Sequence, residues 1–497
     1  MALDPSESQM PLGTRAERLS DQVVRGGFWV IGSRLGTRLI GAAGTLVLAR
    51  FLAPHDFGLA AIAVLPLSVF ASFGVTRTRA ALIYRQTYSR ALLDTAWTLG
   101  ILRRAGATVL LMVGAPALGV FFESADAIPL IRVMAILPLL HGLRNVGMVE
   151  FQQDLRLSPD TLLDVSRQVA ETFVGVGIAI WSGSVWALVA GALTGEVVAT
   201  LISYAVHPYR PRLRLDLHEL RHLAGFGGWI LGSRLVEWTV VSGVQAFVGR
   251  GFGTAALGVF QMADRMTQLS LGQLSRIAAD ITLPAFVRLR AEPARLRTAY
   301  LRVVTVVALV TCPVTAFLGV YSDSTVRVLL GPNWTDAGPI VGILALYWMF
   351  RSLAGTSSPL LQALGRPRLQ TATAVIELAV VIAAVSLFHR HLVSVATALA
   401  VGGVVAMVVA FTLVSRFCRV DGRNWCQALS FPGLGAVGIL MLAAVLPYPH
   451  DAIGLAGVVA AFLAIYVAIL VGLLHFRICT LDPELRAMVG RWLSRLA

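Results

Sequence analysis

Apolar runs long enough to cross a lipid bilayer recur along almost the whole chain. A helix needs about 20 predominantly apolar residues to span the hydrocarbon core. Runs of that length lie near residues 26–49, 57–76, 97–121, 128–149, 161–181, 185–206, 225–249, 255–282, 299–320, 338–364, 369–388, 392–415, 429–446 and 452–475. Backbone polar groups in lipid must be satisfied within the protein, and the runs show no strand-like alternation. They therefore predict an all-α integral membrane protein with about fourteen transmembrane helices.

The composition agrees with this class. Of the 497 residues, 57% are hydrophobic and only 14% are charged, whereas about a quarter of the residues in soluble domains are charged. The formal net charge of +14 comes from arginine alone, because the chain contains no lysine. The arginines lie mostly in short loops between apolar runs, which favours a membrane protein over one that binds nucleic acid.

The arginines also predict an orientation. The N-terminus, the even-numbered loops and the C-terminus carry about 25 arginines, and the odd-numbered loops carry about 4. Positive charge is retained on the cytoplasmic side, so both termini are expected in the cytoplasm. Residues 1–25 are polar, and the run that follows lacks a small-residue cleavage site. We expect this run to remain as the first span and not to be a cleaved signal peptide.

The sequence repeats itself at an offset of 200 residues. Matched pairs are Gly27 and Gly227, Trp29 and Trp229, Gly32 and Gly232, Ser33 and Ser233, Arg34 and Arg234, Leu35 and Leu235, Arg50 and Arg250, and Gly58 and Gly258. Six helices separate the two copies, so both halves have the same orientation. This predicts two parallel six-helix repeats with a substrate path between them.

The repeat and the loops together predict a division of the chain. The expected parts are a cytoplasmic N-terminal segment (1–25), an N-terminal six-helix bundle (26–206), a cytoplasmic linker (207–224), a C-terminal six-helix bundle (225–415), two further helices (416–475) and a cytoplasmic tail (476–497). Internal duplication makes a monomer sufficient for transport.

Charged residues within the predicted spans are candidates for function, because an arginine at a helix centre costs about 2.5–3.5 kcal/mol on insertion. Arg34 and Arg38 share one helix face, and Arg234 has Glu237 three residues later. Arg34 alternatively snorkels to the interface, and Arg234 and Glu237 alternatively form a structural pair. Further charges within spans are Glu171, Glu196, Asp264, Arg265, Arg351 and Glu377. The pattern favours an interfacial position for Arg103 and Arg104, and Arg144 and Arg167 are placed near the cytoplasmic surface.

Five segments resemble one transporter family. They are "LARFLAPHDFG", "ALGVFQMADRM", "LPAFVRLR", "LLGPNW" and "LQALGRPRLQ", in this order. The resemblance is to the polysaccharide transporter branch of the multidrug/oligosaccharidyl-lipid/polysaccharide exporter superfamily, the Wzx-type flippases of lipid-linked oligosaccharides. Phe260 and Gln261 depart from the Tyr and Ser that members often carry. The resemblance implies two six-helix bundles around a central cavity, alternating access, and a place in the bacterial inner membrane. The implied cargo is an undecaprenyl-pyrophosphate-linked glycan for exopolysaccharide, capsule or lipopolysaccharide synthesis.

A pyrophosphate cargo gives the charges expected roles. Arginine offers a permanent charge and a planar donor fork that fits phosphate. The predicted substrate-binding residues are Arg34, Arg38, Arg234, Arg265, Arg351 and Trp238. The candidates for coupling to H⁺ or Na⁺ are Glu171, Glu196, Glu237, Asp264 and Glu377. The membrane potential is an alternative driving force, and no cofactor or metal site is expected.

Three alternatives remain open. A drug antiporter of the same superfamily would favour an acidic cavity, and a lipid II flippase would share the cargo chemistry. A membrane-embedded glycan polymerase or glycosyltransferase is a third alternative, although the external loops are short. Expected partners are the glycan lipid, membrane lipids and, functionally, a glycan polymerase; no nucleic acid is expected.

Overall fold

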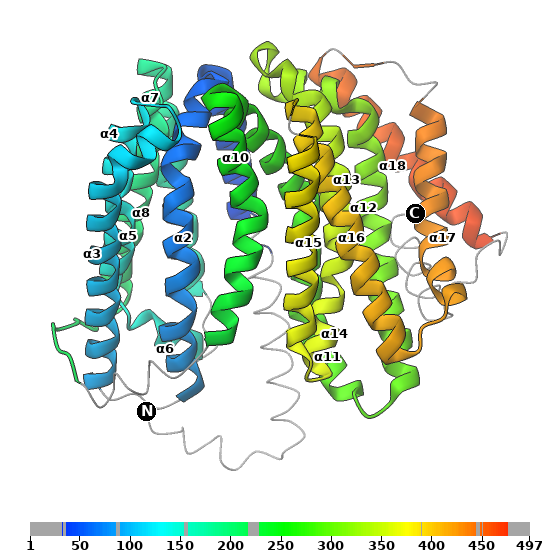
Figure 1. The fold of residues 1–497 in the computed structure, drawn as a ribbon, viewed down its shortest axis with the longest axis horizontal. Coiled ribbons are helices and arrows are strands. Elements are labelled where there is room, and N and C mark those ends of the chain that lie inside the picture. The colour runs from blue at the N-terminus through cyan, green and yellow to red at the C-terminus, as the bar shows by residue number, and fades with distance from the viewer. Residues whose placement is uncertain are drawn as a thin grey trace. The chain divides into compact units, whose positions relative to one another are not determined.

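The computed structural model describes residues 32, 36–85, 90–153, 158–216, 228–388, 390–443, 448, 449 and 451–475. The chain folds into two compact units. Unit 1 comprises Met1–Leu52 and Leu59–Leu231, and unit 2 comprises Ala53–Gly58 and Gly232–Ala497. The regular structure of the described residues is entirely helical (Figure 1).

Unit 1 is a bundle of helices joined by short connections. After a helix over residues 36–50, the elements are α2 (Pro54–Arg85), α3 (Arg90–Phe121), α4 (Ala127–Met134), α5 (Ile136–Leu143), α6 (Met148–Gln153), α7 (Ser158–Ser182) and α8 (Trp186–Val206). Helix α7 packs along α8, and α3 packs against α4 and α5. The first residues of α2 belong to unit 2.

Unit 2 begins with the long α10 and has α12 at its centre. Its elements are α10 (Gly228–Thr267), the π-helix η1 (Gln268–Gly272), α11 (Leu274–Leu289), α12 (Pro293–Leu330), the 3₁₀ helix η2 (Pro332–Ala337), α13 (Gly338–Gly355), α14 (Ser357–Ala363), α15 (Pro367–Leu387), α16 (Leu392–Cys418), α17 (Gly422–Ala443) and α18 (Ala452–His475). Helix α12 packs against α13 and α17, and α16 packs against α13 and α15.

Six of the described helices are long and apolar enough to cross a membrane. They are Arg90–Phe121, Trp186–Val206, Pro293–Leu330, Pro332–Ala363, Pro367–Leu387 and Leu392–Cys418. Shorter apolar helices occupy Pro54–Phe70, Ala127–Leu143, Pro432–Met441 and Ala452–Ala468. The chain is therefore a multi-pass helical membrane protein, as predicted, while the count of about fourteen spans stays a prediction.

Three predicted spans differ from the helices observed. The span expected over 128–149 is interrupted, because α5 ends at Leu143 and residues 144–147 leave the helix. Asn145 there uses its side chain to bind the backbone of residues 207 and 209 instead. The span expected at 225–249 runs on in α10 into the first half of the span expected at 255–282, with only Gly253 (φ 85°) of α10 outside helical geometry. Glycine reaches such a positive φ without a Cβ clash. The second half of the span expected at 255–282 forms η1 and the start of α11.

Matched glycines of the sequence repeat meet within unit 2. A Cβ added at Gly58 would lie 1.8 Å from the carbonyl oxygen of Thr254, and one added at Gly258 would lie 1.8 Å from that of Pro54. Neither position admits a side chain, because the two helix backbones touch. The reciprocal contact is the local symmetry expected where two copies of a repeat cross.

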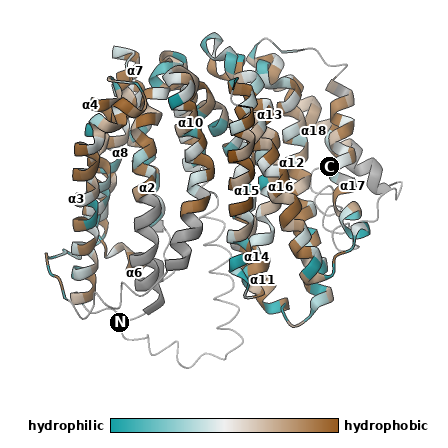
Figure 2. Ribbon diagram, in the orientation of Figure 1, coloured by the Kyte–Doolittle hydropathy of each residue, from teal (hydrophilic) through white to brown (hydrophobic). Residues whose placement is uncertain are grey.

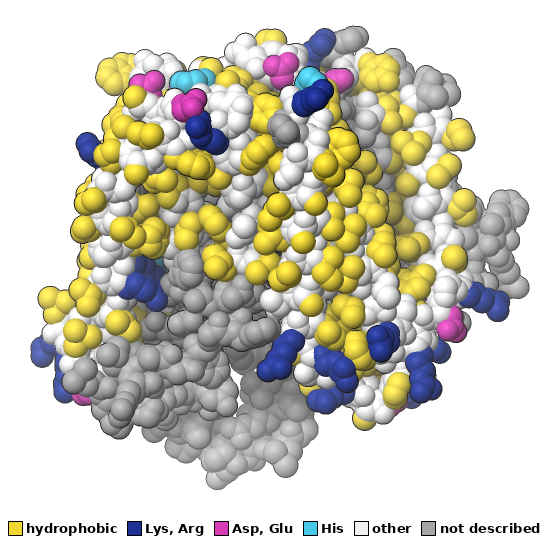
Figure 3. Space-filling model, in the orientation of Figure 1, with side chains coloured by type: hydrophobic (Ala, Val, Ile, Leu, Met, Phe, Trp, Pro, Cys, Tyr) yellow, Lys and Arg dark blue, Asp and Glu magenta, His cyan; other side chains and the backbone are white. Residues whose placement is uncertain are grey.

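Hydropathy varies along the helices in the way a bilayer requires. Figure 2 shows hydrophobic residues along the middle of the helices in each unit and hydrophilic residues concentrated towards their ends. The space-filling view shows a broad belt of hydrophobic side chains, with arginines gathered below it on unit 2 (Figure 3). Such a belt excludes water from the outer surface, so polar groups inside each unit must find partners or line a hydrated space.

Candidate anion-binding cavity

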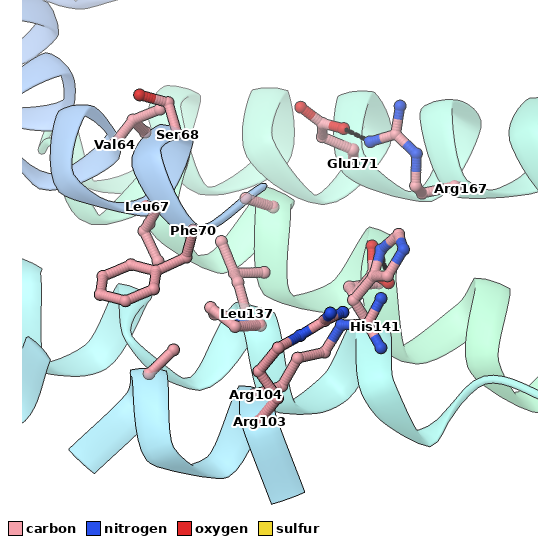
Figure 4. A pocket seen from close by; sticks show the side chains of 14 residues that line it. Val64, Leu67, Ser68, Phe70, Arg103, Arg104, Leu137, His141, Arg167 and Glu171 are labelled. Atoms are coloured by element: carbon pink, nitrogen blue, oxygen red, sulfur yellow. Dashed lines mark hydrogen bonds and ion pairs between the residues drawn. The ribbon is translucent and has the colours of Figure 1, made fainter. Parts of the chain in front are cut away.

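Unit 1 encloses a cavity of about 630 Å³ between α2, α3, α5, α7 and α8 (Figure 4). Cavities of this size accommodate drug-sized ligands. All of its lining residues belong to unit 1. The lining residues are Val64, Leu67, Ser68, Phe70, Arg103, Arg104, Ala107, Leu137, Pro138, His141, Arg167, Glu171, Ala192 and Glu196.

Two consecutive arginines of α3 form one side of the cavity. In Figure 4 the side chains of Arg103 and Arg104 extend together beneath His141 of α5. Helix α5 carries Gly142 at this point, where a Cβ would lie 2.9 Å from Cδ of Arg104. The missing side chain at Gly142 therefore leaves the space through which Arg104 reaches the cavity.

A second charged group joins α5, its following loop and α8. Nη2 of Arg144 donates to Oε2 of Glu196 at 2.8 Å, and Nε of Arg144 lies 2.8 Å from Oε1. Nδ1 of His141 lies 3.1 Å from the same Oε1. Arg144 also interacts electrostatically with Arg104. Glu196 thus compensates the charge of Arg144 and leaves Arg104 beside a group that is already neutralised.

The third charged group lies on α7. Nη1 of Arg167 contacts Oε2 of Glu171 at 2.6 Å, one helical turn away. About a third of each side chain remains exposed. This pair faces the cavity from the side opposite the α3 arginines in Figure 4.

Small residues bring these groups together. Gly191 and Gly195 of α8 are four residues apart and face α7; a Cβ at Gly195 would lie 2.8 Å from the carbonyl oxygen of Arg167. A Cβ at Gly191 would lie 2.6 Å from the carbonyl oxygen of Glu171. Close backbone approach through small residues is the usual way for helices to pack in membranes. It places the Glu196 cluster within reach of the Arg167 pair.

The cavity has a basic part and an apolar part. The lining arginines at positions 103, 104 and 167 outnumber the lining glutamates at 171 and 196 by one. Arg144, which contacts Glu196 from beside the cavity, adds a second positive charge. Leu67, Phe70 and Leu137 supply an apolar wall on the other side. Such a site suits a ligand that joins an anionic group to a less polar one, because arginine binds phosphate oxygens with a planar donor fork.

Unit 2 holds a different polar cluster. The buried carboxylate of Asp264 accepts a hydrogen bond from Nε1 of Trp348 at 2.8 Å and a longer one from Gln245 at 3.4 Å. On the same helix as Trp348, Arg351 forms an ion pair with Glu377 and donates to the Tyr347 hydroxyl at 2.9 Å. The cluster is acidic, with two carboxylates and one arginine.

The structure places the predicted site residues unevenly. Glu171 and Glu196 lie in the unit 1 cavity, whereas Asp264, Arg351 and Glu377 belong to the unit 2 cluster. Arg34 lies outside the described residues, as do the side chains of Arg234 and Glu237. Their proposed two-fold anion site therefore stays a prediction.

Three further predicted residues do not line the cavity. Arg38 lies partly exposed on the helix over 36–50, Arg265 is exposed on α10, and Trp238 is partly buried on α10. Among the described residues, no group of three His, Cys, Asp or Glu side chains could hold a metal ion.

Arg103 and Arg104 have a neighbourhood that the sequence did not reveal. The sequence favoured an interfacial position, which stays a prediction, and the structure shows that both residues line the cavity with His141. The available signal was their place inside an apolar run, "TLGILRRAGATVLLMVG", where two adjacent arginines have no acidic neighbour. Sequence reasoning did not identify His141 at all, although it lies three residues before Arg144 and its helix, α5, contains no Asp, Glu or Arg.

Fold and cavity together define a class: a multi-pass helical membrane protein with a basic chamber inside one of its bundles. The sequence pattern of the family described as "Polysaccharide biosynthesis protein" matches residues 47–339, more than half of the chain. The chain belongs to this family. The resemblance found in the sequence is thereby confirmed.

Individual relatives agree. The chain is 25% identical over 58% of its length to the teichuronic acid biosynthesis protein TuaB of Bacillus subtilis (strain 168), of which it spans 60%. It is 22% identical over 69% of its length to the succinoglycan biosynthesis transport protein ExoT of Rhizobium meliloti (strain 1021), of which it spans 70%. The chain thus spans well under the whole length of these curated relatives.

The fold has a solved counterpart. The lipid II flippase MurJ in an inward closed conformation superposes with a TM-score of 0.73 and 13% identity, covering 90% of this chain and 98% of that one. At this identity the likeness shows the fold alone. The fold is that of a membrane transporter, and the relatives carry names in polysaccharide biosynthesis and transport.

Proposed function

We propose that the protein is a flippase that moves undecaprenyl-pyrophosphate-linked oligosaccharide repeat units across the bacterial inner membrane by alternating access. The product would serve exopolysaccharide, capsule or lipopolysaccharide synthesis. The proposal includes cytoplasmic termini, functional coupling to a glycan polymerase, and no cofactor. The observation that carries it is the excess of arginine in a cavity that also has an apolar wall.

The chemistry of the cargo matches that cavity. A diphosphate that leaves water loses many hydrogen bonds, and a fixed set of guanidinium groups can replace them. Arg103 and Arg104 would bind the diphosphate, while Glu171 and Glu196 hold Arg167 and Arg144 in position. Leu67, Phe70 and Leu137 would contact the less polar part of the cargo.

The direction of transport has two candidate driving forces. Moving one elementary charge through 100 mV is worth about 2.3 kcal/mol, so an inside-negative potential favours outward movement of a dianion. Coupling to H⁺ or Na⁺ through Glu171, Glu196, Glu237, Asp264 or Glu377 is the second. The protein would move its cargo without making or breaking a covalent bond, which distinguishes it from a glycan polymerase.

The test uses purified full-length protein in liposomes. A fluorescent polyprenyl-pyrophosphate oligosaccharide is incorporated, and its exposure on each leaflet is followed over time. Flipping that requires the protein and leaves the glycan chemically unchanged supports the proposal. Lipid II and a cationic drug serve as competing cargoes. Faster movement of either one, or elongation of the glycan, would replace the proposed function with the corresponding alternative.

A further inference from the structure

An extended segment, residues 207–216, lies along the N-terminal end of α3; we call it the strap. Figure 1 shows it at the lower left as an irregular segment beside that end of the helix. Helix α8 ends at Val206, just before the strap, whose sequence is "HPYRPRLRLD". The proposed function makes no use of these residues.

The strap is bound to unit 1 through its backbone. The N–H groups of Arg212, Arg214 and Asp216 donate to side chains of α3, at 3.0, 3.0 and 3.2 Å. Their acceptors are Asp94, Thr98 and Thr95, all of which are buried. A donor at every second residue is the pattern of an extended chain. These backbone bonds do not involve the side chains of Arg212 and Arg214.

The loop after α5 holds the other end of the strap. The side-chain amide of Asn145 donates to the carbonyl oxygens of His207 and Tyr209, at 3.3 and 2.8 Å. Gly147 lies directly against this segment, because a Cβ there would lie 2.5 Å from Nδ1 of His207. The whole strap is thus fixed between two parts of unit 1.

Side chains of the strap form two rows. Alternate residues of an extended chain point to opposite sides, so Arg212 and Arg214 form one row and Leu213 and Leu215 form the other. The 3.9 Å contact between Arg214 and Asp216 agrees with this alternation. Leu213 is 78% exposed and Leu215 is 51% exposed. Two leucines on a fixed backbone are thus presented beside two arginines.

Charge on this surface is mainly positive. Arg90, Arg210, Arg212 and Arg214 are exposed. The carboxylate of Asp94 is buried beneath the strap, where the Tyr209 hydroxyl donates to it. Burial, with Asp94 beside it, raises the pKa of the Tyr209 phenol, so this donor stays protonated. Glu150 contacts His207 at 3.2 Å. The acids near the strap are therefore either covered or already paired.

The length of α3 argues that the strap is at the depth of lipid headgroups. Helix α3 has 32 residues, which corresponds to about 48 Å, whereas the hydrocarbon core is about 30 Å thick. The first turns of α3 therefore extend beyond the hydrocarbon, and the strap is bonded to these turns. In Figure 3 this lower left edge of unit 1 carries arginine and hydrophobic side chains together.

We propose that the strap binds anionic phospholipid headgroups of the leaflet at the N-terminal end of α3. The arginine row contacts the phosphates, and Leu213 and Leu215 reach toward the acyl chains. Basic residues next to a membrane attract anionic lipid, and amphipathic elements lie at this boundary. The occupant is a lipid and not a soluble protein, because the strap lies beside a transmembrane helix at headgroup depth.

The experiment measures which lipid touches the strap. Leu213 is replaced by an environment-sensitive fluorescent amino acid, and the full chain is placed in nanodiscs of equal phosphatidylglycerol and phosphatidylcholine. One of the two lipids carries brominated acyl chains, which quench the fluorophore on contact. We expect brominated phosphatidylglycerol to quench with about a fivefold preference over brominated phosphatidylcholine, and the preference to shrink in 0.5 M salt.

Two matched variants decide the assignment. Arg212→Gln with Arg214→Gln should reduce the preference to near parity, since it removes the arginine row but leaves the backbone bonds intact. Arg288→Gln with Arg290→Gln removes two exposed arginines at the same spacing in unit 2 and should change nothing. Equal quenching by both lipids, no quenching by either, or a preference unaffected by salt and by the strap variant would each overturn the proposal. Absence of quenching together with water exposure at position 213 would place the strap in water, away from the lipid.

Discussion

The two units of the molecule treat their internal charges in opposite ways. In unit 1, Arg103, Arg104 and Arg167 line a cavity together with Glu171 and Glu196, and Arg144 beside the cavity brings the excess of arginine over glutamate to two charges. In unit 2, Asp264 and Glu377 outnumber the one arginine of their cluster, and neutral donors such as Trp348 satisfy the rest. A buried charge is stable either in a hydrated cavity or among partners that fill its hydrogen-bonding capacity. Unit 1 combines a cavity with ion pairs at its wall, whereas the charges of the unit 2 cluster have partners only within that cluster.

Because of this difference, we expect the two units to interact differently with an anionic cargo. An anionic cargo is attracted to the arginines of unit 1 and repelled by an acidic cluster such as that of unit 2. A cluster without excess positive charge can stabilise helix packing or respond to cations. We therefore expect substitutions in unit 1 to change cargo binding, and those in unit 2 to change stability or coupling.

The largest effect is expected from removing the two α3 arginines. Arg103→Gln with Arg104→Gln should lower the rate of diphosphate-lipid flipping about 100-fold, because each lost charge-assisted hydrogen bond costs about 1.5–3 kcal/mol. The liposome assay measures it. The control is Arg288→Gln with Arg290→Gln, which removes the same charge from the surface of unit 2. Normal flipping by the α3 variant would show that the unit 1 cavity is not the cargo-binding site.

The two buried ion pairs offer a direct comparison. Arg144→Met or Glu196→Leu alone should destabilise the protein by about 3 kcal/mol, because each leaves an uncompensated buried charge. Arg351→Met or Glu377→Leu should do the same in unit 2. Combining both changes within a pair should restore most of the thermal stability in each unit, since no lone charge remains.

The flipping rates of the double variants should then distinguish the two ion pairs. The unit 2 double variant should flip cargo at a rate within about threefold of the original, whereas the unit 1 double variant should stay impaired because its cavity has lost part of its polar wall. Equal recovery of flipping by both double variants would contradict the assigned difference between the units.

A smaller effect is expected at the helix crossing behind the cavity. Gly195→Ala should cost about 1–3 kcal/mol in stability, because its Cβ would lie 2.8 Å from the backbone oxygen of Arg167. The displaced α7 should also slow flipping. Gly177→Ala on α7 is the matched control, with open space around its Cα. Thermal unfolding and flipping that fail to distinguish the two alanines would show that the crossing does not set the cavity geometry.

The smallest effect concerns the unit 2 cluster. Trp348→Phe removes the indole donor to Asp264 and should destabilise the protein by about 1–3 kcal/mol, the cost of leaving a buried acceptor without a partner. Affinity for a prenyl diphosphate should stay within about twofold, since the tryptophan lies outside unit 1. A larger loss of affinity than of stability would place unit 2 in the cargo site.

The apolar runs of the sequence predict most of the helices but not the points at which the helices are interrupted. The spans expected at 185–206 and 392–415 coincide with α8 and α16, because uninterrupted apolar runs leave lipid-exposed backbone no alternative to a helix. The break at residues 144–147 depends on hydrogen bonds from Asn145 to a segment more than sixty residues away. No local pattern contains that information.

The site was only partly predictable for a related reason. Glu171 and Glu196 could be singled out because acids within spans are costly, and both line the cavity. Their role in ion coupling stays a prediction. Arg103 and Arg104 were expected at the interface, and that position stays a prediction. Their place in a cavity depends on α5, α7 and α8, which supply most of the other lining residues and lie far away in the sequence.

The most direct measurement of the central claim is diphosphate binding without transport. A short-chain polyprenyl diphosphate, which lacks the glycan, is titrated into full-length protein in nanodiscs, with the monophosphate as a comparison. We predict preference for the diphosphate, a loss of at least about tenfold in affinity in Arg103→Gln with Arg104→Gln, and unchanged affinity in Arg351→Met with Glu377→Leu. Equal affinity in the unsubstituted protein and both double variants, or a loss confined to the unit 2 variant, would contradict the claim that the unit 1 arginines bind the diphosphate.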